Sequence, residues 1–348
     1  MTCVPPEAGV DAVAMDLMPA VVPLGGSLWG ASFKLMKMLP AHHIVDAALA
    51  SGEIGPNTMI VESTSGTFGV ALAVKAALIR RPLTLVTDPV MDRRLCRRLA
   101  DLGASIEMCA TPSPRGEFQT MRLTRLAEIR ERYPDHFWPR QYDNPRNPAS
   151  YAVLLDHFAG QLGRVDALIG PVGSGGSMCG TATALRACFP HLVAVGVDTP
   201  GSVLFGQPDQ VRELRGLGNS VLPRNLDHTV FDEVHWCPPG VAYRETRRLH
   251  RRHALFHGPT SGAALAVARW WAASHPGKVT VVMLPDQGDR YIDTVYDEAW
   301  LDADPRRRVP ADVRPREVPT PSGDPDWTWM RWGRRTLAEV CGEQALAG

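Results

Sequence analysis

A turn of glycines and serines joins an apolar segment, residues 165–172, to a stretch of small residues with helical character. The turn consists of Gly173, Ser174, Gly175, Gly176 and Ser177. Glycines have no side chain to keep an anion away from the backbone, and the N–H groups at the start of a helix favour negative charge. The serine hydroxyls add donors. The turn therefore predicts a phosphate-binding loop.

Two familiar types of phosphate loop do not fit this turn. The dinucleotide fingerprint G-x-G-x-x-G would need a glycine where Met178 stands, and an ATP-type loop needs Gly-Lys-Ser/Thr, which is absent here. A glycine-rich turn by itself is also compatible with an ordinary tight turn. Other segments must decide which ligand carries the phosphate.

Lysines are few in this chain, so any chemistry that needs an amine is confined to four positions: Lys34, Lys37, Lys75 and Lys278. The sequence around the last two is typical of surface positions. Lys34 follows a glycine-rich apolar segment at the expected start of a helix, where desolvation could lower the pKa of its amine enough for nucleophilic chemistry. Lys37, one helical turn further on, is the competitor, and a solvated helix face is expected for it. Lys34 is therefore the predicted reactive amine.

A third polar segment, Thr64, Ser65 and Gly66, precedes a predicted helix over residues 68–79. Its hydroxyls and backbone N–H groups could bind the carboxylate of an amino acid, as the N-terminus of a helix does. The alternative is that Ser65 or Thr67 is simply the N-cap of that helix.

Taken together, these segments resemble the pyridoxal-phosphate enzymes of fold type II, specifically the cysteine synthase and cystathionine β-synthase family. The resemblance covers about residues 20 to 300. Its segments occur in the order found in that family: 25–27 with 32–34, 62–69, 141–147, 173–177 and 284–291. Pyridoxal 5′-phosphate is the cofactor that the resemblance implies, because the phosphate loop and a reactive lysine are what such a cofactor needs.

The resemblance also implies a role for each matching residue. Lys34 forms the Schiff base with the cofactor and acts as the general base. Thr67 contacts the cofactor ring, the turn at 173–177 binds the cofactor phosphate, and Asp286 or Gln287, one position apart, faces the pyridine nitrogen. The substrate carboxylate is assigned to Thr64, Ser65, Gly66 and Gln141.

Several positions depart from the usual pattern of this family. Leu35-Met36 follows Lys34 where Asp-Arg is usual, Thr67 replaces an asparagine, and Tyr151 stands where histidine is common. A threonine hydroxyl has a different hydrogen-bonding capacity from an asparagine amide. The chain is therefore predicted to be a divergent member, whose substrate does not follow from that of any well-known member.

The reaction implied is β-replacement on an O-activated L-serine, of the O-acetylserine or O-phosphoserine type. It proceeds via an aminoacrylate to cysteine or a related β-substituted alanine, so the partners are a small amino acid and a small nucleophile. One alternative is β-elimination of the dehydratase or desulfhydrase type. Another, of a different class, is a non-catalytic relative that uses the pyridoxal-phosphate fold for binding.

Composition agrees with a globular enzyme. The chain has 348 residues, 45% of them hydrophobic, and 37 basic residues balance 37 acidic ones. The balance gives no general attraction to nucleic acid or to an anionic membrane. The seven cysteines are dispersed without paired spacing, which argues against structural zinc, and no metal site is predicted. A cytoplasmic enzyme that forms a homodimer is expected.

Short apolar strands alternate with helical stretches, which is typical of parallel sheets covered by helices. We expect an α/β fold of two lobes, like the β subunit of tryptophan synthase. Residues 1–33 and 148–301 form the larger, cofactor-binding lobe, 34–147 the smaller, mobile lobe, and 302–348 a proline-rich linker with a tryptophan-rich tail. The tail is expected to dock on its own protein or on a sister subunit, with a partner-binding tail as the alternative. Predicted strands cover 59–62, 83–87, 105–108, 166–169, 193–197 and 279–284, and predicted helices 68–79, 91–102, 178–187, 261–273 and 336–345.

Overall fold

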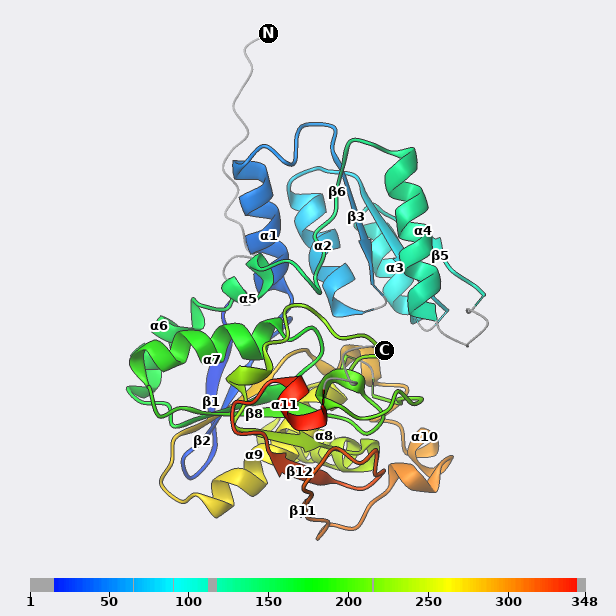
Figure 1. The fold of residues 1–348 in the computed structure, drawn as a ribbon. Helices are drawn as coiled ribbons and strands as arrows, with labels where there is room; N and C mark the ends of the chain where they lie inside the picture. Colours follow the sequence, from blue (N-terminus) through cyan, green and yellow to red (C-terminus); the bar gives the residue numbers. More distant parts are fainter. Residues whose placement is uncertain (1–15, 65, 90, 112–117, 215, 343–348) are drawn as a thin grey trace.

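Two sheets, one of four strands and one of eight, form the centres of two lobes (Figure 1). The computed structural model describes residues 16–64, 66–89, 91–111, 118–214 and 216–342. Helices cover the sheets of both lobes, so the α/β class predicted from the sequence is confirmed. Within the described residues, no helix is both long enough and apolar enough to cross a membrane.

The sheet of the smaller lobe is parallel and has the strand order β5-β4-β3-β6. Its strands are β3 Met59–Ser63, β4 Leu83–Thr87, β5 Ala104–Met108 and β6 His136–Phe137. Its helices are α1 Met38–Ala50, α2 Thr67–Leu78, α3 Arg93–Asp101 and α4 Phe118–Arg132. Successive strand residues point to opposite faces. Ile60 and Leu85 therefore pack with α1, α2 and α3, whereas Val61 and Val86 pack against α4.

The larger lobe is built on the strand order β1-β2-β10-β7-β8-β9-β12-β11. Its strands are β1 Ala20–Gly25, β2 Leu28–Ser32, β7 Ala167–Pro171, β8 Val193–Asp198, β9 Glu233–Trp236, β10 Thr280–Leu284, β11 Arg316–Glu317 and β12 Thr328–Arg331. The five from β2 to β9 run parallel, and β7 and β10 are buried along their whole length, as expected of strands covered on both faces.

Helices cover both faces of the larger sheet. They are α5 Arg146–Ala149, α6 Leu154–Leu162, α7 Gly176–Cys188, α8 Pro239–His253, α9 Pro259–Ser274, α10 Glu298–Asp302 and α11 Leu337–Cys341. Leu168 packs in the cluster with α6 and α7, and the next residue, Ile169, packs in the cluster with α8 and α9. The strands and helices predicted up to residue 284 are present, and their ends differ from the prediction by at most two residues.

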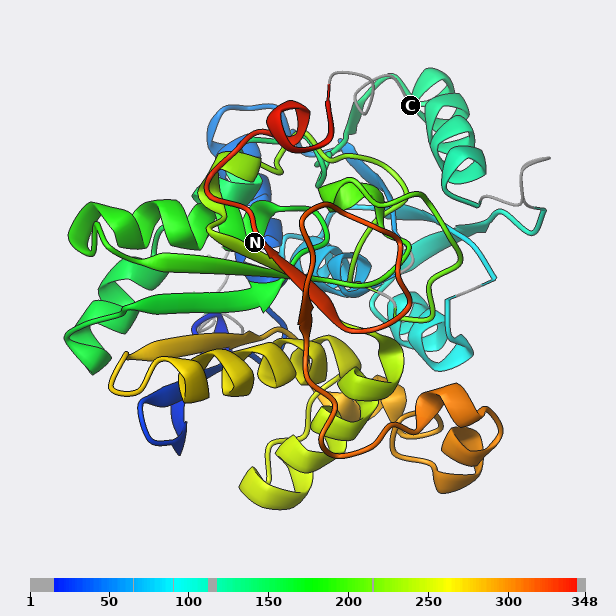
Figure 2. The same ribbon diagram turned by 60° about the horizontal axis from the view of Figure 1, so that its bottom comes forward.

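The C-terminal segment is part of the larger lobe and not a separate tail. β12 pairs antiparallel with β9, with Thr328 opposite Trp236 and Met330 opposite Val234. Trp327 and Trp332, on either side of this strand, are 4% and 0% exposed. Figure 2 shows β12 lying along the sheet, with α11 beyond it. The predicted docking of the aromatic cluster thus takes place on its own chain, through a strand that the sequence did not predict.

Parallel strands of both lobes end in the segments that carry the predicted chemistry. β7 leads to the glycine turn, β10 leads to Asp286, and β3 leads to Thr64. Open α/β sheets bind their ligands beyond the carboxyl ends of their strands. The fold therefore brings these three segments toward one region between the lobes.

We expect Trp332→Ala to destabilise the protein by about 3–5 kcal/mol, because truncating a buried aromatic side chain leaves a cavity. The Trp332 ring lies edge to face with Phe205 at 5.2 Å between centroids, and its indole N–H donates to the Arg335 carbonyl oxygen at 2.6 Å. Thermal unfolding measures the effect. Tyr133→Ala is the matched control, because it truncates an aromatic residue that is 49% exposed. An unchanged melting temperature for Trp332→Ala would mean that the C-terminal segment is not part of the cooperative core.

Candidate active site

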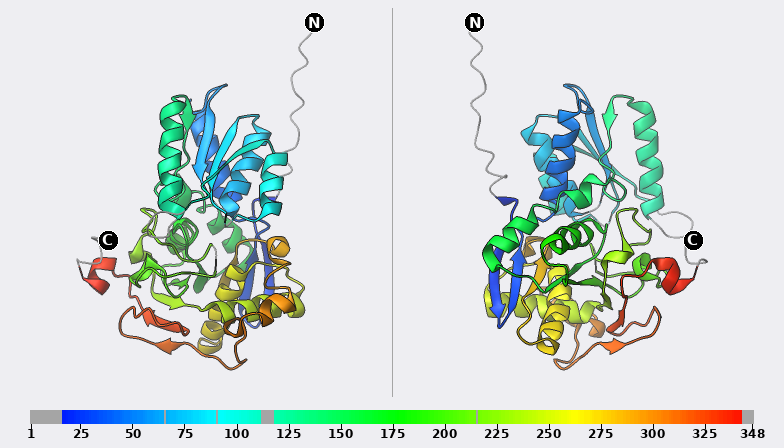
Figure 3. Two further views of the ribbon diagram at one scale, coloured as in Figure 1. Left: turned by 90° about the vertical axis from the view of Figure 1, so that its right-hand side faces the viewer. Right: turned by 60° about the vertical axis from the view of Figure 1, so that its left-hand side comes forward.

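A cavity of about 190 Å³ lies between elements of the two lobes. The smaller lobe contributes the starts of α1 and α2, and the larger lobe contributes the glycine turn, the start of α9 and the segment after β10. The smaller lobe stands on the larger one in the side views of Figure 3, with the C-terminal segment against the larger lobe. The polar residues that line the cavity are Lys37, Thr64, Thr67, Arg122, Gln141, Tyr142, Ser174, Ser177, Asn219, Thr260, Asp286, Arg290 and Tyr291.

The glycine turn forms one wall of this cavity, at the N-terminus of α7. Gly173, Ser174 and Ser177 line it. Gly175 is the N-cap and has φ +81°, which side chains rarely tolerate, and a Cβ there would lie 2.7 Å from Leu226 Cα. A Cβ on Gly176 would lie 2.2 Å from the Asn147 side-chain oxygen. The turn therefore needs its glycines, and it presents two hydroxyls and a helix N-terminus to the cavity.

The structure places Lys37 in the cavity, whereas the predicted reactive amine, that of Lys34, lies outside the cavity lining. The Lys34 side chain is 62% exposed and its Nζ lies 2.6 Å from Asp16 Oδ2, away from the cavity lining. Lys37 lines the cavity instead, and its Nζ donates to Ser174 Oγ at 3.1 Å. Burial lowers the pKa of the Lys37 amine to about 8.

Long-range backbone contacts explain why Lys37 enters the cavity and Lys34 does not. After β2, the Phe33 N–H donates to the Leu284 carbonyl and the Met36 N–H donates to the Pro285 carbonyl. Phe33 and Met36 are consequently buried, and the chain then enters α1 with Lys37 as its N-cap residue. These hydrogen bonds join residues about 250 positions apart, so no local pattern reveals them.

The start of α2 forms the opposite wall. Thr64, Gly66 and Thr67 line the cavity, whereas Ser65 lies outside the described residues. Gly66 is the N-cap of α2 and Thr67 is its first helical residue, so Thr67 is not the cap. The Gly69 N–H donates to the Gly66 carbonyl, and no side-chain cap is present within the described residues, which leaves the N–H groups of Thr67 and Phe68 for an anion.

Asp286 and Gln287, the two residues predicted to face the pyridine nitrogen, differ in whether they line the cavity. Asp286 does, and Gln287 is exposed and outside the lining. Asp286 Oδ2 accepts a hydrogen bond from the Tyr291 hydroxyl at 2.9 Å, and Oδ1 is buried without a hydrogen-bond partner among the described residues. Burial raises the pKa of this carboxyl. Thr260, at the start of α9, lines the same cavity and was not predicted.

Other polar lining residues were also missed, among them Arg122, Tyr142 and Asn219. Arg122 comes from α4, is 8% exposed, and has its Nε 3.3 Å from Asp88 Oδ2. Tyr142 is hydrogen-bonded to Asn219, and burial raises the pKa of its phenol. Arg122 is one of several arginines on α4, and nothing in the local sequence distinguishes it. Tyr142, in contrast, directly follows the predicted Gln141, and its position was a usable signal.

Gln141 lines the cavity and its backbone is fixed on both sides. Its N–H donates to Glu62 Oε2 at 3.3 Å, and its carbonyl accepts from Asn147 Nδ2 at 2.6 Å and from Asn225 Nδ2 at 3.0 Å. Burial raises the pKa of Glu62 to about 7, although Trp138 and the Ser63 N–H also donate to this carboxyl. Glu62 therefore positions the Gln141 segment from behind the cavity.

Comparison with known proteins identifies the family. The profile described as "Pyridoxal-phosphate dependent enzyme" matches residues 30–286. The chain belongs to this family. Its cofactor is pyridoxal 5′-phosphate, and the family, the enzyme class and the cofactor predicted from the sequence are all confirmed.

Individual relatives support a cysteine synthase-like enzyme. The chain is 37% identical over 272 residues to N-(2-amino-2-carboxyethyl)-L-glutamate synthase of Cupriavidus metallidurans, covering 76% of this chain and 80% of the relative. It is 37% identical over 270 residues, with the same coverage, to the synthase of the same name from Ralstonia nicotianae. Among solved structures, O-ureido-L-serine synthase superposes with a TM-score of 0.74 at 25% identity, over 84% of this chain and 99% of that one.

The cavity fits the cofactor chemically. A phosphate group suits the hydroxyls and helix N-terminus at the glycine turn, and the buried amine of Lys37 suits an aldehyde. The free oxygen of Asp286 suits a protonated ring nitrogen. The described residues contain no group of three or more histidine, cysteine or acidic side chains that could hold a metal ion.

We expect the cofactor to be linked to Lys37. Borohydride reduction of the wild-type enzyme, followed by peptide mass spectrometry, should place the reduced cofactor on the peptide that contains Lys37. Lys37→Ala should give no such adduct while keeping its fold by circular dichroism, and Lys34→Ala should label like the wild type. An adduct on Lys34, or one that survives in Lys37→Ala on another amine, would contradict the assignment.

Proposed function

We propose that the protein catalyses pyridoxal-phosphate-dependent β-replacement on an O-activated L-serine, with an acidic amino acid as the nucleophile. The observation that carries the proposal is a single cavity in which the buried Lys37 amine lies 3.1 Å from Ser174 of the glycine turn. The start of α2 lines the same cavity. An amine, a phosphate site and a carboxylate site are the groups that this chemistry needs.

When bound, the cofactor withdraws electrons from the α-carbon of the substrate, which acidifies the α-proton and labilises the β-substituent. In the proposal, the Lys37 amine would hold the cofactor through its aldehyde and would act as the general base for the α-proton of the substrate. Its depressed pKa supports this role, because a larger fraction of the amine is neutral near pH 7. Gly173, Ser174 and Ser177 hold the phosphate, with Gly175 and Gly176 shaping the turn.

The remaining roles follow from which side chains line the cavity. Asp286 keeps the ring nitrogen protonated, and Thr67 and Thr260 contact the ring region. The substrate carboxylate binds at the start of α2, to Thr64 and Gly66, with Gln141 beside them. The sequence-based role of Ser65 in the same loop remains part of the proposal.

The nucleophile is proposed from a buried cation and from the relatives. The name N-(2-amino-2-carboxyethyl)-L-glutamate describes a glutamate whose nitrogen is bonded to the β-carbon of an alanine skeleton. Such a product needs a cavity that accepts the extra carboxylates of glutamate. Arg122 offers a buried guanidinium there, which can bind a carboxylate with two parallel hydrogen bonds, and Tyr142 and Asn219 add polar groups.

Other parts of the proposal concern assembly and location. The substrates are small molecules, as the size of the cavity requires. We keep the homodimer and the cytoplasmic location expected from the sequence as proposals. Sedimentation of the purified enzyme tests the homodimer, and a fully active monomer would contradict it.

The rate at which the cofactor attaches to the apoprotein should rise with pH around the pKa of Lys37. Only the neutral amine attacks the aldehyde, and with a pKa of about 8 its neutral fraction rises about tenfold between pH ~7 and pH ~9, then levels off. An ordinary lysine would still be rising steeply above pH ~9. Stopped-flow absorbance measures the rate, and a profile without a plateau near pH ~9 would contradict a desolvated amine.

We expect product formation from O-phospho-L-serine or O-acetyl-L-serine with L-glutamate, detected by mass spectrometry. Arg122→Ala should lower kcat/KM for glutamate about 10- to 100-fold, since a charged hydrogen-bond partner is worth about 1.5–3 kcal/mol. Arg125→Ala, on the same helix but outside the cavity lining, is the matched control. Melting temperatures of both variants separate lost binding from lost folding.

The same assay distinguishes the alternative reactions. Equal amounts of pyruvate with and without an amine or sulfide would indicate β-elimination. A product with sulfide but none with glutamate would keep β-replacement and remove the proposed nucleophile. No turnover of either serine ester by holoenzyme would favour a non-catalytic binding protein.

A further inference from the structure

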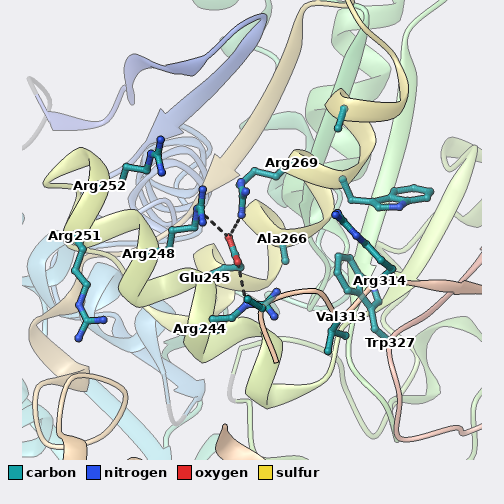
Figure 4. Close-up of a pocket in the computed structure, with 13 residues that line it drawn as sticks. Arg244, Glu245, Arg248, Arg251, Arg252, Ala266, Arg269, Val313, Arg314 and Trp327 are labelled. Atoms are coloured by element: carbon teal, nitrogen blue, oxygen red, sulfur yellow. Dashed lines mark hydrogen bonds and ion pairs between the residues drawn. The ribbon is translucent and has the colours of Figure 1, made fainter. Parts of the chain in front are cut away.

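A second and larger hollow, of about 740 Å³, lies among α8, α9 and the segment that precedes β12 (Figure 4). We call it the arginine pocket. It shares no lining residue with the active-site cavity. Six arginines and a single glutamate supply its charges: Arg244, Arg248, Arg251, Arg252, Arg269, Arg314 and Glu245. This excess of positive charge in one pocket favours the binding of an anion.

One face of α8 provides most of these arginines. These arginines project to the same side of the helix, because all their spacings except that of the adjacent Arg251 and Arg252 are three, four, seven or eight residues. They are Arg244, Arg248, Arg251 and Arg252. Arg269 reaches in from α9, and Arg314 enters from the C-terminal segment. The pocket is thus surrounded by guanidinium groups from three parts of the chain.

The single carboxylate is buried at the base of the cluster and is shared. Glu245 is 4% exposed at its side chain, with Arg269 at 2.6 Å, Arg244 at 3.1 Å and Arg248 at 3.9 Å. Figure 4 shows these three side chains converging on Glu245. One negative charge therefore faces three positive ones.

The other arginines of the pocket receive little compensation. Arg251 lies 3.4 Å from Glu298, which also pairs with Arg247 and Arg308. In the part of the chain that the structure describes, Arg252 and Arg314 have no carboxylate within ion-pair distance. Positive charge therefore remains unpaired in the pocket.

The positive charges of the pocket lower the pKa values of neighbouring basic groups. Burial and then the charge of Arg269 lower the pKa of Arg248, against the opposing effect of Glu245. Burial and then the charges of Arg252, Arg248 and Arg269 lower the pKa of His253. A bound anion would relieve this repulsion.

The apolar lining of the pocket comes partly from α9 and partly from residues beyond the family match, which ends at residue 286. Trp327 and Val313 come from this C-terminal segment and face Trp270 and Ala266 of α9. Arg244 donates to the Pro310 carbonyl, which ties the segment to α8. The arginine pocket is therefore completed by residues that lie beyond the family match.

We propose that the arginine pocket binds a small polyanion, a molecule with two or more neighbouring phosphate or carboxylate groups. Guanidinium groups bind such oxygens with paired, charge-assisted hydrogen bonds. The volume matches that of a small-molecule site, and the formal charge of the whole chain is zero, which does not favour a long nucleic acid. The site is independent of the reaction proposed above.

Calorimetric titration of the holoenzyme tests the proposal, with inorganic triphosphate and citrate as probes and acetate as the singly charged reference. The bound cofactor occupies the glycine turn, so the probes cannot bind to that phosphate site. Triphosphate, citrate or both should bind with an affinity that falls as salt is added. Arg252→Ala/Arg314→Ala should weaken binding about tenfold or more, because two unpaired guanidinium groups are removed.

Arg97→Ala/Arg132→Ala is the matched control, because it removes the same charge from exposed positions of the smaller lobe. This control should bind the probes like the wild type. Binding of triphosphate alone would identify phosphate groups as the ligand, and binding of citrate alone would identify carboxylates. The proposal is overturned if neither probe binds more tightly than acetate, or if the pocket variant and the control bind equally well.

Discussion

Burying the amine of Lys37 is unfavourable unless nearby polar groups compensate it, and much of the surrounding structure holds that amine in place. Ser174 contacts it directly, at 3.1 Å. Ser174 is in turn 3.4 Å from Asn147 Nδ2, which donates to the carbonyl of Gln141 at 2.6 Å. Gln141 donates to the buried Glu62. A continuous line of hydrogen bonds thus runs from the glycine turn of the larger lobe into the sheet of the smaller one.

This arrangement also explains the distribution of glycine around the cavity. Gly176 leaves room for Asn147, and Gly175 leaves room for Leu226, so the turn can close against the segment that carries Gln141. The parallel strands that lead into these segments are buried on both faces and give them a rigid base. The cavity is therefore set by backbone contacts, and its few polar side chains project from well-anchored positions.

The parts of the site that depend on short sequence segments could be predicted, whereas the parts that depend on contacts between distant residues could not. The glycine turn and the start of α2 follow local rules for helix N-termini, and both line the cavity as expected. Lys34 and Lys37 follow the same apolar segment, and the choice between them depends on hydrogen bonds to Leu284 and Pro285. Arg122 is buried where α4 packs against β3 and β4, which are distant from it in the sequence.

The C-terminal segment shows that the folded larger lobe extends beyond the family match. The match to the family profile ends at residue 286, yet the larger sheet continues through β12, which covers the edge of β9. A fragment cut where the similarity stops would leave the backbone donors and acceptors of β9 unpaired beside Trp236, and an open edge of this kind invites pairing with other chains. The shortest soluble fragment of this enzyme should therefore extend past Trp332.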